Sequence, residues 1–442
     1  MLKYLYQWLD ERIKLKPIQI KLLEEPIPGG ASWIYVYGSI TLFLFVLQLI
    51  SGMFLAIYYN PSPNHAYDSI LYIEQEVHFG SFVRGLHHWG ASLMMIAIGL
   101  HMLQVFLYGA YKKPREIMWI VGVLLFLLTL AFGFSGYLLP WDQKAYWATQ
   151  VGINIVGTIP WVGDVLIRII RGGQQLGALT LNRFYALHAL FLPWAIVLLI
   201  ALHLFILRRV GPAGPWDLEK ARQISEPFYP KQVFMDAAAI LVTFVFLLIL
   251  AGWAKVPMAD RANPSDVSFM PVPEWYFLFY YQLLKYFRGP WEIIGTVVLP
   301  LLFYALLFLL PFLDRTPRQD LLSRRGVLVC GGLFLLTVFG LLGTSLKQIA
   351  SIPVTDPAVE QGKRLYTKLG CSGCHRIHGE GTQVGPDLSY VGDSRDKDWL
   401  IRHFKDPQAM VPGSIMPAYS LSNPELKQLT AYMLSLKRSR MP

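Results

Sequence analysis

Charged residues and cysteines are both scarce in this sequence. Of its 442 residues, 15% are charged, whereas 54% are hydrophobic and 14% are aromatic. Such a composition excludes an ordinary water-soluble globule, so most of the chain is expected to lie in a membrane. The three cysteines, Cys330, Cys371 and Cys374, are too few for the disulfide framework of a small secreted protein. We find no solenoid repeat and no low-complexity tract. We also expect no cleavable signal sequence, because the first apolar run is long and starts late.

Acidic residues are outnumbered, with 29 Asp and Glu against 39 Lys and Arg, which gives a net charge of +10. This balance can indicate nucleic-acid binding, but here the positive charges lie in short loops between apolar runs. The positive-inside bias explains them better, so no nucleic-acid partner is expected. These basic loops follow the second, fourth and sixth spans, so all of them lie on the same side of the membrane as the basic N-terminus. This arrangement predicts a cytoplasmic N-terminus and an outer C-terminus. The basic residues of these loops are Lys112, Lys113, Arg115, Arg208, Arg209, Lys220, Arg222, Lys231, Arg315, Arg318, Arg324 and Arg325.

The apolar runs predict an all-α membrane protein with seven transmembrane helices followed by a small all-α soluble domain. The runs lie at about 34–57, 82–107, 117–139, 184–207, 233–254, 293–313 and 326–346. Residues 1–33 are mixed and charged, which favours a surface helix on the membrane. The expected regions are this helix at 1–33, a helical core at 34–254, an outer loop with the last two spans at 255–346, a linker at 347–358 and the soluble domain at 359–442.

Four histidines lie within two of the predicted spans. His87 and His101 are 14 residues apart in the second span, and His188 and His203 are 15 apart in the fourth. If these helices run side by side in the same direction, the histidines form two stacked pairs, separated by roughly 21 Å along the axis. His88 would point about 140° away from His101, so we set it aside as a ligand. A single intramembrane histidine most often bonds between helices, but two matched pairs favour metal ligation.

Facing neutral imidazoles suit a six-coordinate haem, so two non-covalent b-type haems are expected, one near each membrane face. Arg84 and Arg183 lie about one turn outside His87 and His188 and are candidates for pairing with haem propionates, or else are interfacial anchors. Glycines at the same levels of the first and third spans would let a flat macrocycle approach, although glycine is common in membrane helices. These glycines are Gly38, Gly52, Gly122 and Gly136.

The C-terminal region contains the haem-attachment motif C-x-x-C-H at residues 371–375. We expect Cys371 and Cys374 to bind one c-type haem through thioether bonds, with His375 as an axial ligand. Met416 is the favoured sixth ligand, because the following proline suits an exposed ligand loop, and Met410 is its rival. Met433 lies on the closing helix, His378 and His403 are expected at the surface, and Cys330 is expected to be a small buried residue. Covalent c-type haem is attached outside the cytoplasm, in agreement with the predicted topology.

Residues 20–345 closely resemble cytochrome b of the Rieske/cytochrome b complexes, the quinol–cytochrome c or plastocyanin oxidoreductases. The matching stretches are RGLHHWGAS (84–92), GYLLPWDQKAYW (136–147), NRFYALH (182–188) and PEWYFLFYYQLLKYF (273–287). The 15-residue histidine spacing and the sequence at 140–143 are closer to the chloroplast-type branch of the family. In that branch, cytochrome b is split into two polypeptides, whereas here the matching parts are continuous. That branch holds an additional haem on a cysteine, but Val36 stands at the corresponding position, which argues against a third haem in the membrane part.

The resemblance implies that residues 273–276 line an outer quinol-oxidation pocket, in which Glu274 accepts a proton. The aromatic and proline neighbours agree, because a carboxylate in an apolar setting can exchange protons near neutrality. The alternative is an ordinary helix-start glutamate after Pro273. Tyr137 and the loop at 140–161 are expected to form the opposite wall, facing Trp275 and Tyr276. For an inner quinone site, the candidates are Arg208, Lys231 and Asp236.

The expected protein is therefore a fused cytochrome b and c subunit of a quinol-oxidising complex in the bacterial inner membrane. One electron would pass through a Rieske iron–sulfur protein to the haem c and on to a soluble or membrane acceptor. The other would cross the membrane through the two b haems, coupled to proton translocation. No C-x-H-x-x-C run occurs, so the Rieske centre is expected on a separate subunit, and family members are dimers. The alternatives are a di-haem anchor for a partner dehydrogenase and a haem-handling or transport protein.

Reduced-minus-oxidised spectra of the purified protein are expected to show two b-type haems for each c-type haem. After denaturation, only the c-type haem should remain with the polypeptide, because it alone is covalently attached. A chain that loses all its haem on denaturation would contradict the assignment of the C-terminal domain.

Overall fold

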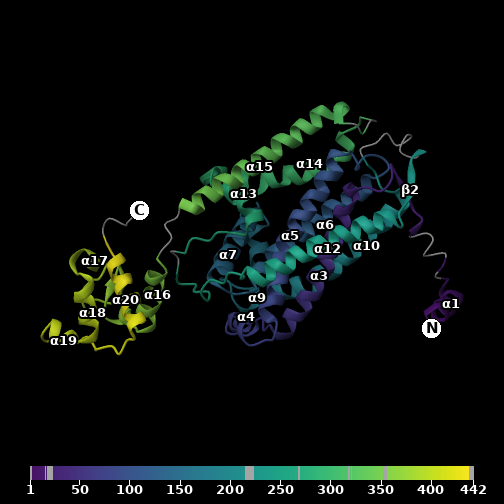
Figure 1. Cartoon of the computed structure of the whole chain (residues 1–442). Coiled ribbons are helices and arrows are strands. Elements are labelled where there is room, and N and C mark those ends of the chain that lie inside the picture. The colour runs from purple at the N-terminus through teal and green to yellow at the C-terminus, as the bar shows by residue number, and fades with distance from the viewer. Residues whose placement is uncertain are drawn as a thin grey trace. The chain divides into compact units, whose positions relative to one another are not determined.

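The computed structural model describes residues 2–14, 16, 23–214, 223–266, 269–316, 319, 321–351 and 356–437. Of the predicted basic loop residues, Lys220, Arg222 and Arg318 lie outside this part. The chain divides into two compact units, Met1–Leu346 and Lys347–Pro442, which are described separately (Figure 1).

Seven of the described helices are long and apolar enough to cross a membrane, which confirms the predicted number and the helical fold class. Four are single helices: α5 (Gly80–Leu107), α6 (Glu116–Tyr137), α12 (Lys231–Trp253) and α15 (Arg325–Ser351). The first span joins a short 3₁₀ turn, η1 (Trp33–Tyr35), to α3 (Val36–Tyr58). Helix α15 continues to Ser351, so the first residues of the predicted linker are helical.

The fourth and sixth spans are each interrupted by a π-helical turn. In the fourth, α9 (Ala178–Ala186) passes through η2 (Leu187–Phe191) into α10 (Leu192–Val210). In the sixth, the 3₁₀ turn η3 (Gly289–Trp291) precedes η4 (Ile294–Val298) and α14 (Leu299–Leu313). A proline, Pro193 or Pro300, follows shortly after each π turn. Because proline has no N–H, it cannot close the regular helical ladder, and the wider turn accommodates the break.

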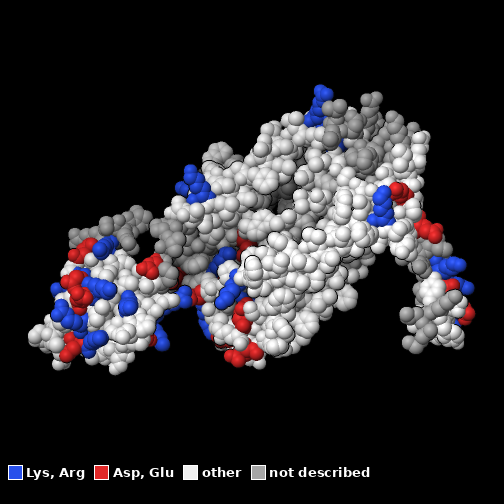
Figure 2. All heavy atoms as spheres, in the orientation of Figure 1, with Lys and Arg blue, Asp and Glu red and all other residues white. Residues whose placement is uncertain are grey.

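The centre of the membrane unit is a bundle in which α5 packs against α3 and α12, while α10 packs against α6. Its buried side chains come from α3, α5, α10 and α12, and they are Leu44, Phe45, Met94, Ala97, Ile98, Ile196 and Leu247. The face shown in Figure 2 is almost free of charged side chains along the bundle, and charges gather near the helix ends. This distribution is the one that a lipid environment requires.

The two ends of the bundle differ. One end, which we call the α7 end, carries the shorter helices α4 (Ala66–Gln75), α7 (Gln143–Gly157), α8 (Gly163–Arg171) and α13 (Trp275–Leu284) (Figure 1). The other, the β2 end, carries a small antiparallel pair, β1 (Pro26–Pro28) and β2 (Ser225–Pro227). Helix α1 (Leu2–Ile13) precedes this pair in the chain.

At the α7 end, the start of α7 holds the segment that precedes α13. Asp142 caps α7 by accepting from the Ala145 N–H at 2.7 Å, and its other oxygen accepts from Ala259 N–H at 3.0 Å. Gln143 extends the contact, because its Oε1 accepts from the Asn263 N–H at 2.6 Å. Both side chains are buried. The chain at 259–263 is thereby fixed against α7 before it reaches Glu274.

A buried ionic cluster joins the α5–α6 loop to the α14–α15 loop. Asp314 binds Lys112 and Arg324, both at 3.0 Å, and accepts from the Tyr111 hydroxyl at 2.6 Å. Arg324 is 1% exposed and also donates to the carbonyls of Phe106 and Leu107, which end α5. Burial alone would raise the pKa of Asp314, but the hydrogen bonds from its partners outweigh it and hold that pKa below its usual range.

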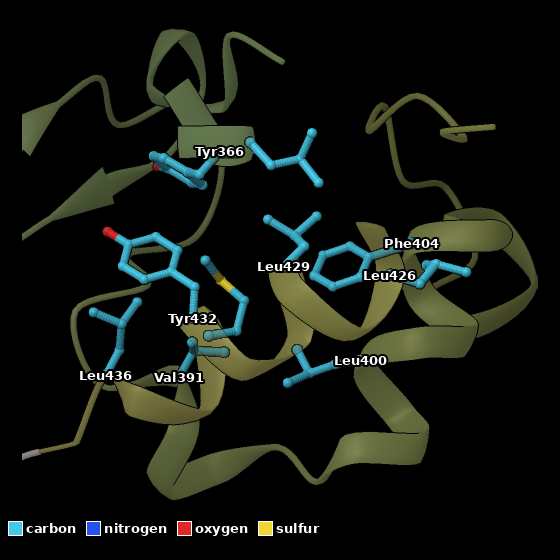
Figure 3. Close-up of a cluster of buried hydrophobic side chains, with 10 residues drawn as sticks. Tyr366, Val391, Leu400, Phe404, Leu426, Leu429, Tyr432 and Leu436 are labelled. Atoms are coloured by element: carbon cyan, nitrogen blue, oxygen red, sulfur yellow. The ribbon is translucent and has the colours of Figure 1, made fainter. Parts of the chain in front are cut away.

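The second unit is a small helical domain. Helices α16 (Pro357–Lys368) and α20 (Asn423–Ser435) pack closely, because Gly362 lies against the backbone of Gln428. The remaining elements are η6 (Cys371–Gly373), β3 (Arg376–Ile377), β4 (Glu380–Gly381), α17 (Val391–Ser394), α18 (Lys397–Lys405) and α19 (Pro407–Met410). Its core, shown in Figure 3, comprises Leu365, Tyr366, Val391, Leu400, Phe404, Leu426, Leu429, Tyr432, Met433 and Leu436.

Asp314→Ala is expected to destabilise the membrane unit by about 3 kcal/mol, because it leaves two buried cations without their carboxylate. Thermal unfolding in detergent should show this as a melting temperature several degrees lower. Arg325→Ala, at an exposed position beside the cluster, is the control and should leave the melting temperature nearly unchanged. Equal melting temperatures for the two variants would contradict a stabilising role for the cluster.

Candidate functional site

The four spaced histidines form two facing pairs. His87 and His101 lie on α5, His188 lies in the π turn η2, and His203 lies on α10. The ring centroids are 6.3 Å apart for His87 and His188 and 6.5 Å apart for His101 and His203. Two metal–nitrogen bonds of about 2.0 Å on opposite sides of one ion would place the ring centroids roughly 6 Å apart. Each pair is therefore spaced to hold one metal centre between its rings.

The four predicted glycines lie beside these histidines, one to each ring. A Cβ on Gly38 or Gly122 would lie 3.6 Å from Cε1 of His101 or His203, which is ordinary contact. At Gly52 it would lie 3.2 Å from His87, and at Gly136 only 2.5 Å from His188. The Gly136 position therefore excludes any side chain while His188 keeps its place.

Two serines orient the imidazoles of the pair at the α7 end. Ser51 Oγ lies 3.0 Å from His87 Nδ1, and Ser135 Oγ lies 3.1 Å from His188 Nδ1. Each hydroxyl donates its proton to a carbonyl of its own helix, Leu47 or Phe132, so its oxygen is left to accept from Nδ1–H. This assigns the tautomer in which Nε2 is free to bind a metal. Among the described residues, no such hydroxyl partner is seen for Nδ1 of His101 or His203.

The sequence analysis did not find these serines, although a signal was present. Each directly precedes one of the spaced glycines, in the dipeptides Ser51-Gly52 and Ser135-Gly136. The other two spaced glycines follow Tyr37 and Val121 rather than a serine.

A second cluster of side chains lies at the α7 end around Glu274. Its Oε1 is 3.0 Å from Nζ of Lys144 on α7, and that ammonium lies 5.5 Å from the ring centre of Tyr137. The Tyr137 hydroxyl donates to the Val272 carbonyl at 3.4 Å. Glu274 and Tyr137 are thus brought together, and Lys144 is a member that the sequence analysis missed.

The residues that flank Glu274 contact the membrane helices. The Trp275 indole N–H lies 3.4 Å from Ser92 Oγ on α5, and the Trp275 and Tyr276 ring centroids are 5.6 Å apart. The Tyr276 ring lies against Gly133 of α6, where a Cβ would be 2.9 Å from its hydroxyl oxygen. Pro273 is half-buried before the helix start. The segment 273–276 therefore contacts both α5 and α6, at Ser92 and Gly133.

The two arginines expected near the haem propionates already have protein partners. Arg84 is buried, pairs with Glu74 at 2.5 Å and donates to the Pro257 carbonyl at 3.5 Å. Arg183 is exposed and donates to the carbonyls of Arg168 and Ile169 on α8. Their role toward propionates stays a prediction.

The candidates for an inner quinone site lie at the β2 end and are also paired. Asp236 is buried and accepts from Ser39 Oγ at 3.0 Å and from Gln232 Nε2 at 2.9 Å. Arg208 pairs with Glu25, and Lys231 pairs with Glu226 at 3.1 Å.

In the second unit, the C-x-x-C-H motif spans η6 and the residues after it. His375 Nδ1 donates to the Pro386 carbonyl at 2.9 Å, which leaves Nε2 free as a ligand. Gly385 lies against the same ring, because a Cβ there would be 2.8 Å from Cε1. Cys371 is half-buried and Cys374 exposed. The motif therefore presents two thiols and one oriented imidazole together.

The methionines and the remaining histidines of this unit are also placed. Met416 packs half-buried against the core, whereas Met433 is 2% exposed within it, so Met433 is occupied by packing. Met410 ends α19. His403 stacks on Trp399 with the ring centroids 4.5 Å apart, and His378 contacts Tyr390. Cys330, expected to be buried, is exposed on α15, where an apolar surface faces lipid rather than the core.

Paired intramembrane histidines and a separate C-x-x-C-H motif define the chain as a membrane cytochrome. Three family models match it: "Cytochrome b/b6/petB" over 22–211, "Cytochrome b(C-terminal)/b6/petD" over 261–364 and "Cytochrome c" over 359–437. The chain belongs to the cytochrome b family and carries a cytochrome c domain in its C-terminal part. It is a multi-pass membrane protein of electron transport, and its domains imply haem b and haem c.

Curated relatives agree with this assignment. The chain is 36% identical over 340 residues to the "Cytochrome bc complex cytochrome b subunit" of Chlorobaculum thiosulfatiphilum, covering 76% of this chain and 77% of the relative. It is 45% identical over 223 residues to the "Menaquinol:cytochrome c reductase cytochrome b subunit" of Geobacillus thermodenitrificans, covering 49% of this chain and all of the relative. The solved structure "Hyperthermophilic respiratory Complex III" matches with a TM-score of 0.71 and 31% identity, over 77% of this chain and 91% of that one.

Gly136→Ala is expected to lower the ratio of b-type to c-type haem, because the added Cβ would displace His188. Gly38→Ala, whose Cβ has ordinary contact distances, should keep the ratio. Gly99→Ala, on α5 with nothing within 4 Å of the added Cβ, is the control. Haem content is measured from reduced-minus-oxidised spectra, and an unchanged ratio in Gly136→Ala would contradict a close fit at His188.

Proposed function

We propose that this chain is the cytochrome b/c subunit of a quinol-oxidising Rieske/cytochrome b complex. The observation that carries the proposal is the geometry of the two histidine pairs, with ring centroids 6.3 and 6.5 Å apart on two membrane-spanning helices. The cluster around Glu274 lies beside the first pair. The relative from Chlorobaculum thiosulfatiphilum is named as a subunit of a cytochrome bc complex. The relative from Geobacillus thermodenitrificans is named as a subunit of a menaquinol:cytochrome c reductase, which supports menaquinol as the class of substrate.

The haem ligands proposed for the membrane unit are His87 with His188 and His101 with His203. In the second unit, Cys371 and Cys374 would attach the haem c, and His375 and Met416 would bind its iron. When bound, these haems supply one-electron redox chemistry at both membrane faces and in the c domain. The chain's own contribution is to orient the imidazoles, through Ser51 and Ser135 in the first pair and through the Pro386 carbonyl at His375.

Quinol oxidation is proposed at the α7 end, which faces the outer side. There Pro273, Trp275, Tyr276 and Tyr137 form the walls. Quinol loses two protons outward, and Glu274 accepts one of them from a quinol hydroxyl. A carboxylate within hydrogen-bond reach of the hydroxyl can act as a general base, and its position near the outer face releases the proton outward. One electron goes to a Rieske iron–sulfur partner and onward to the c domain and a downstream acceptor.

The second electron is proposed to cross toward the β2 end and reduce quinone there. Arg208, Lys231 and Asp236 are the candidate residues for this site. Moving one charge across the membrane conserves about 2.3 kcal/mol per 100 mV, which couples turnover to proton translocation. The complex is proposed to lie in a bacterial inner membrane, with a cytoplasmic N-terminus, as a homodimer with further subunits and bound lipid.

A di-haem anchor that only conducts electrons for a dehydrogenase is the second candidate. It would also need the histidine pairs, but it would not need a carboxylate paired with Lys144 beside them. The Glu274 cluster therefore favours quinol oxidation.

Glu274→Gln is expected to lower quinol oxidation by the purified complex about 100-fold, because the amide cannot accept the proton. Haem spectra should be unchanged. Glu76→Gln, an exposed glutamate after α4, is the control and should keep normal turnover. Normal turnover in Glu274→Gln would favour the anchor instead.

A further inference from the structure

The position of Lys144 is unusual for a lysine. It is the second residue of α7, directly after Gln143. The N-terminus of a helix carries partial positive charge, so a cation in the first turn is locally unfavourable. Its side chain is 35% exposed and reaches Glu274 at 3.0 Å. The partner that compensates for this position is therefore far away in the sequence, 130 residues along the chain.

Glu274 also gives up a local interaction. It is the N-cap residue of α13, where a carboxylate often accepts from the first backbone N–H groups, but its side chain makes no capping hydrogen bond. The carboxylate turns instead toward Lys144, and its side chain is only 18% exposed. This geometry disfavours the simple explanation of Glu274 as an ordinary helix-start glutamate.

We propose that Lys144 is a positioning residue whose ammonium, 3.0 Å away, holds the Glu274 carboxylate in place before quinol arrives. The inference rests on the proposed function and extends it. When the quinol O–H bond breaks, its proton forms a new O–H bond on the Glu274 carboxylate, while the electron goes to the iron–sulfur partner. The carboxyl group is then neutral, so its attraction to Lys144 weakens and the side chain is released with its proton.

Other groups face Glu274 from each neighbouring element. Tyr137 lies on α6, Tyr276 on α13, and His88 of α5 interacts electrostatically with both Glu274 and Lys144. Burial, with the Glu274 charge, raises the pKa of Tyr276 above its usual range, so this phenol stays protonated near neutrality. His88 is a second group able to titrate, and the experiment must separate it from Glu274.

The test is the pH profile of kcat/KM for quinol:cytochrome c reduction by the purified complex, with Lys144→Met and Lys144→Arg compared with wild type. In Lys144→Met, the carboxylate loses the cation that favours its ionised form and accepts a proton from solvent at higher pH. The acidic limb of the kcat/KM profile of this variant should move to higher pH. On that limb kcat/KM should be roughly three- to tenfold lower than in wild type, and it should recover at alkaline pH. Lys144→Arg should keep the wild-type limb.

Two controls separate this effect from others. Lys285→Met removes a lysine at the other end of α13, over the Tyr281 ring, and should leave the limb in place. Adding Lys144→Met to Glu274→Gln should cause no further shift, because the titrating partner is gone. Haem spectra report whether each variant is folded.

If the acidic limb is unchanged in Lys144→Met while Glu274→Gln is defective, the role of Lys144 is overturned and the proposed function is not. A shift that persists in the double variant would also overturn the role of Lys144, because it would act through a group other than Glu274. Absence of quinol oxidation by the wild-type complex would overturn the proposed function instead.

Discussion

The membrane unit depends on one constraint, which is that two helices in the same bundle carry their histidines at matching heights. An imidazole inside a membrane must find its partner within the protein, because lipid offers none. The pairs His87 with His188 and His101 with His203 meet this requirement between α5 and the fourth span. The neighbouring helices α3 and α6 place a glycine beside each ring, and at Gly136 there is no room for a larger residue.

The two ends of the bundle are built differently around this common centre. At the α7 end, serine hydroxyls orient the imidazoles, and the segment before α13 is fixed by Asp142 and Gln143. At the β2 end, the described residues offer the histidines no hydroxyl partner, Asp236 accepts from Gln232, and Lys231 pairs with Glu226. The loops that join the spans there are held by the Asp314 cluster. Polar contacts therefore fix a loop segment and two imidazoles at the α7 end, and join the interhelical loops at the β2 end.

The sequence was sufficient to predict the features that depend on local pattern. Apolar runs gave the seven spans, spacing gave the histidine pairs and their glycines, and C-x-x-C-H gave the c domain. It was not sufficient for contacts between distant segments. The pairing of Arg84 with Glu74 and of Lys144 with Glu274 depends on how loops return to the bundle, which no periodicity encodes. The exposure of Cys330 was missed because a lipid-facing surface is as apolar as a core.

The π turn at 187–191 explains an inequality in the histidine spacing. The pair on α5 is separated by 14 residues, whereas the pair on the fourth span is separated by 15. On a regular helix, one additional residue would rotate the second imidazole by about 100° and carry it away from its partner. The turn closes with the Leu192 N–H bonded to the Leu187 carbonyl, so it absorbs one residue just after His188. The 14-residue and 15-residue spacings therefore place their histidines at matching heights, because the π turn accommodates the additional residue.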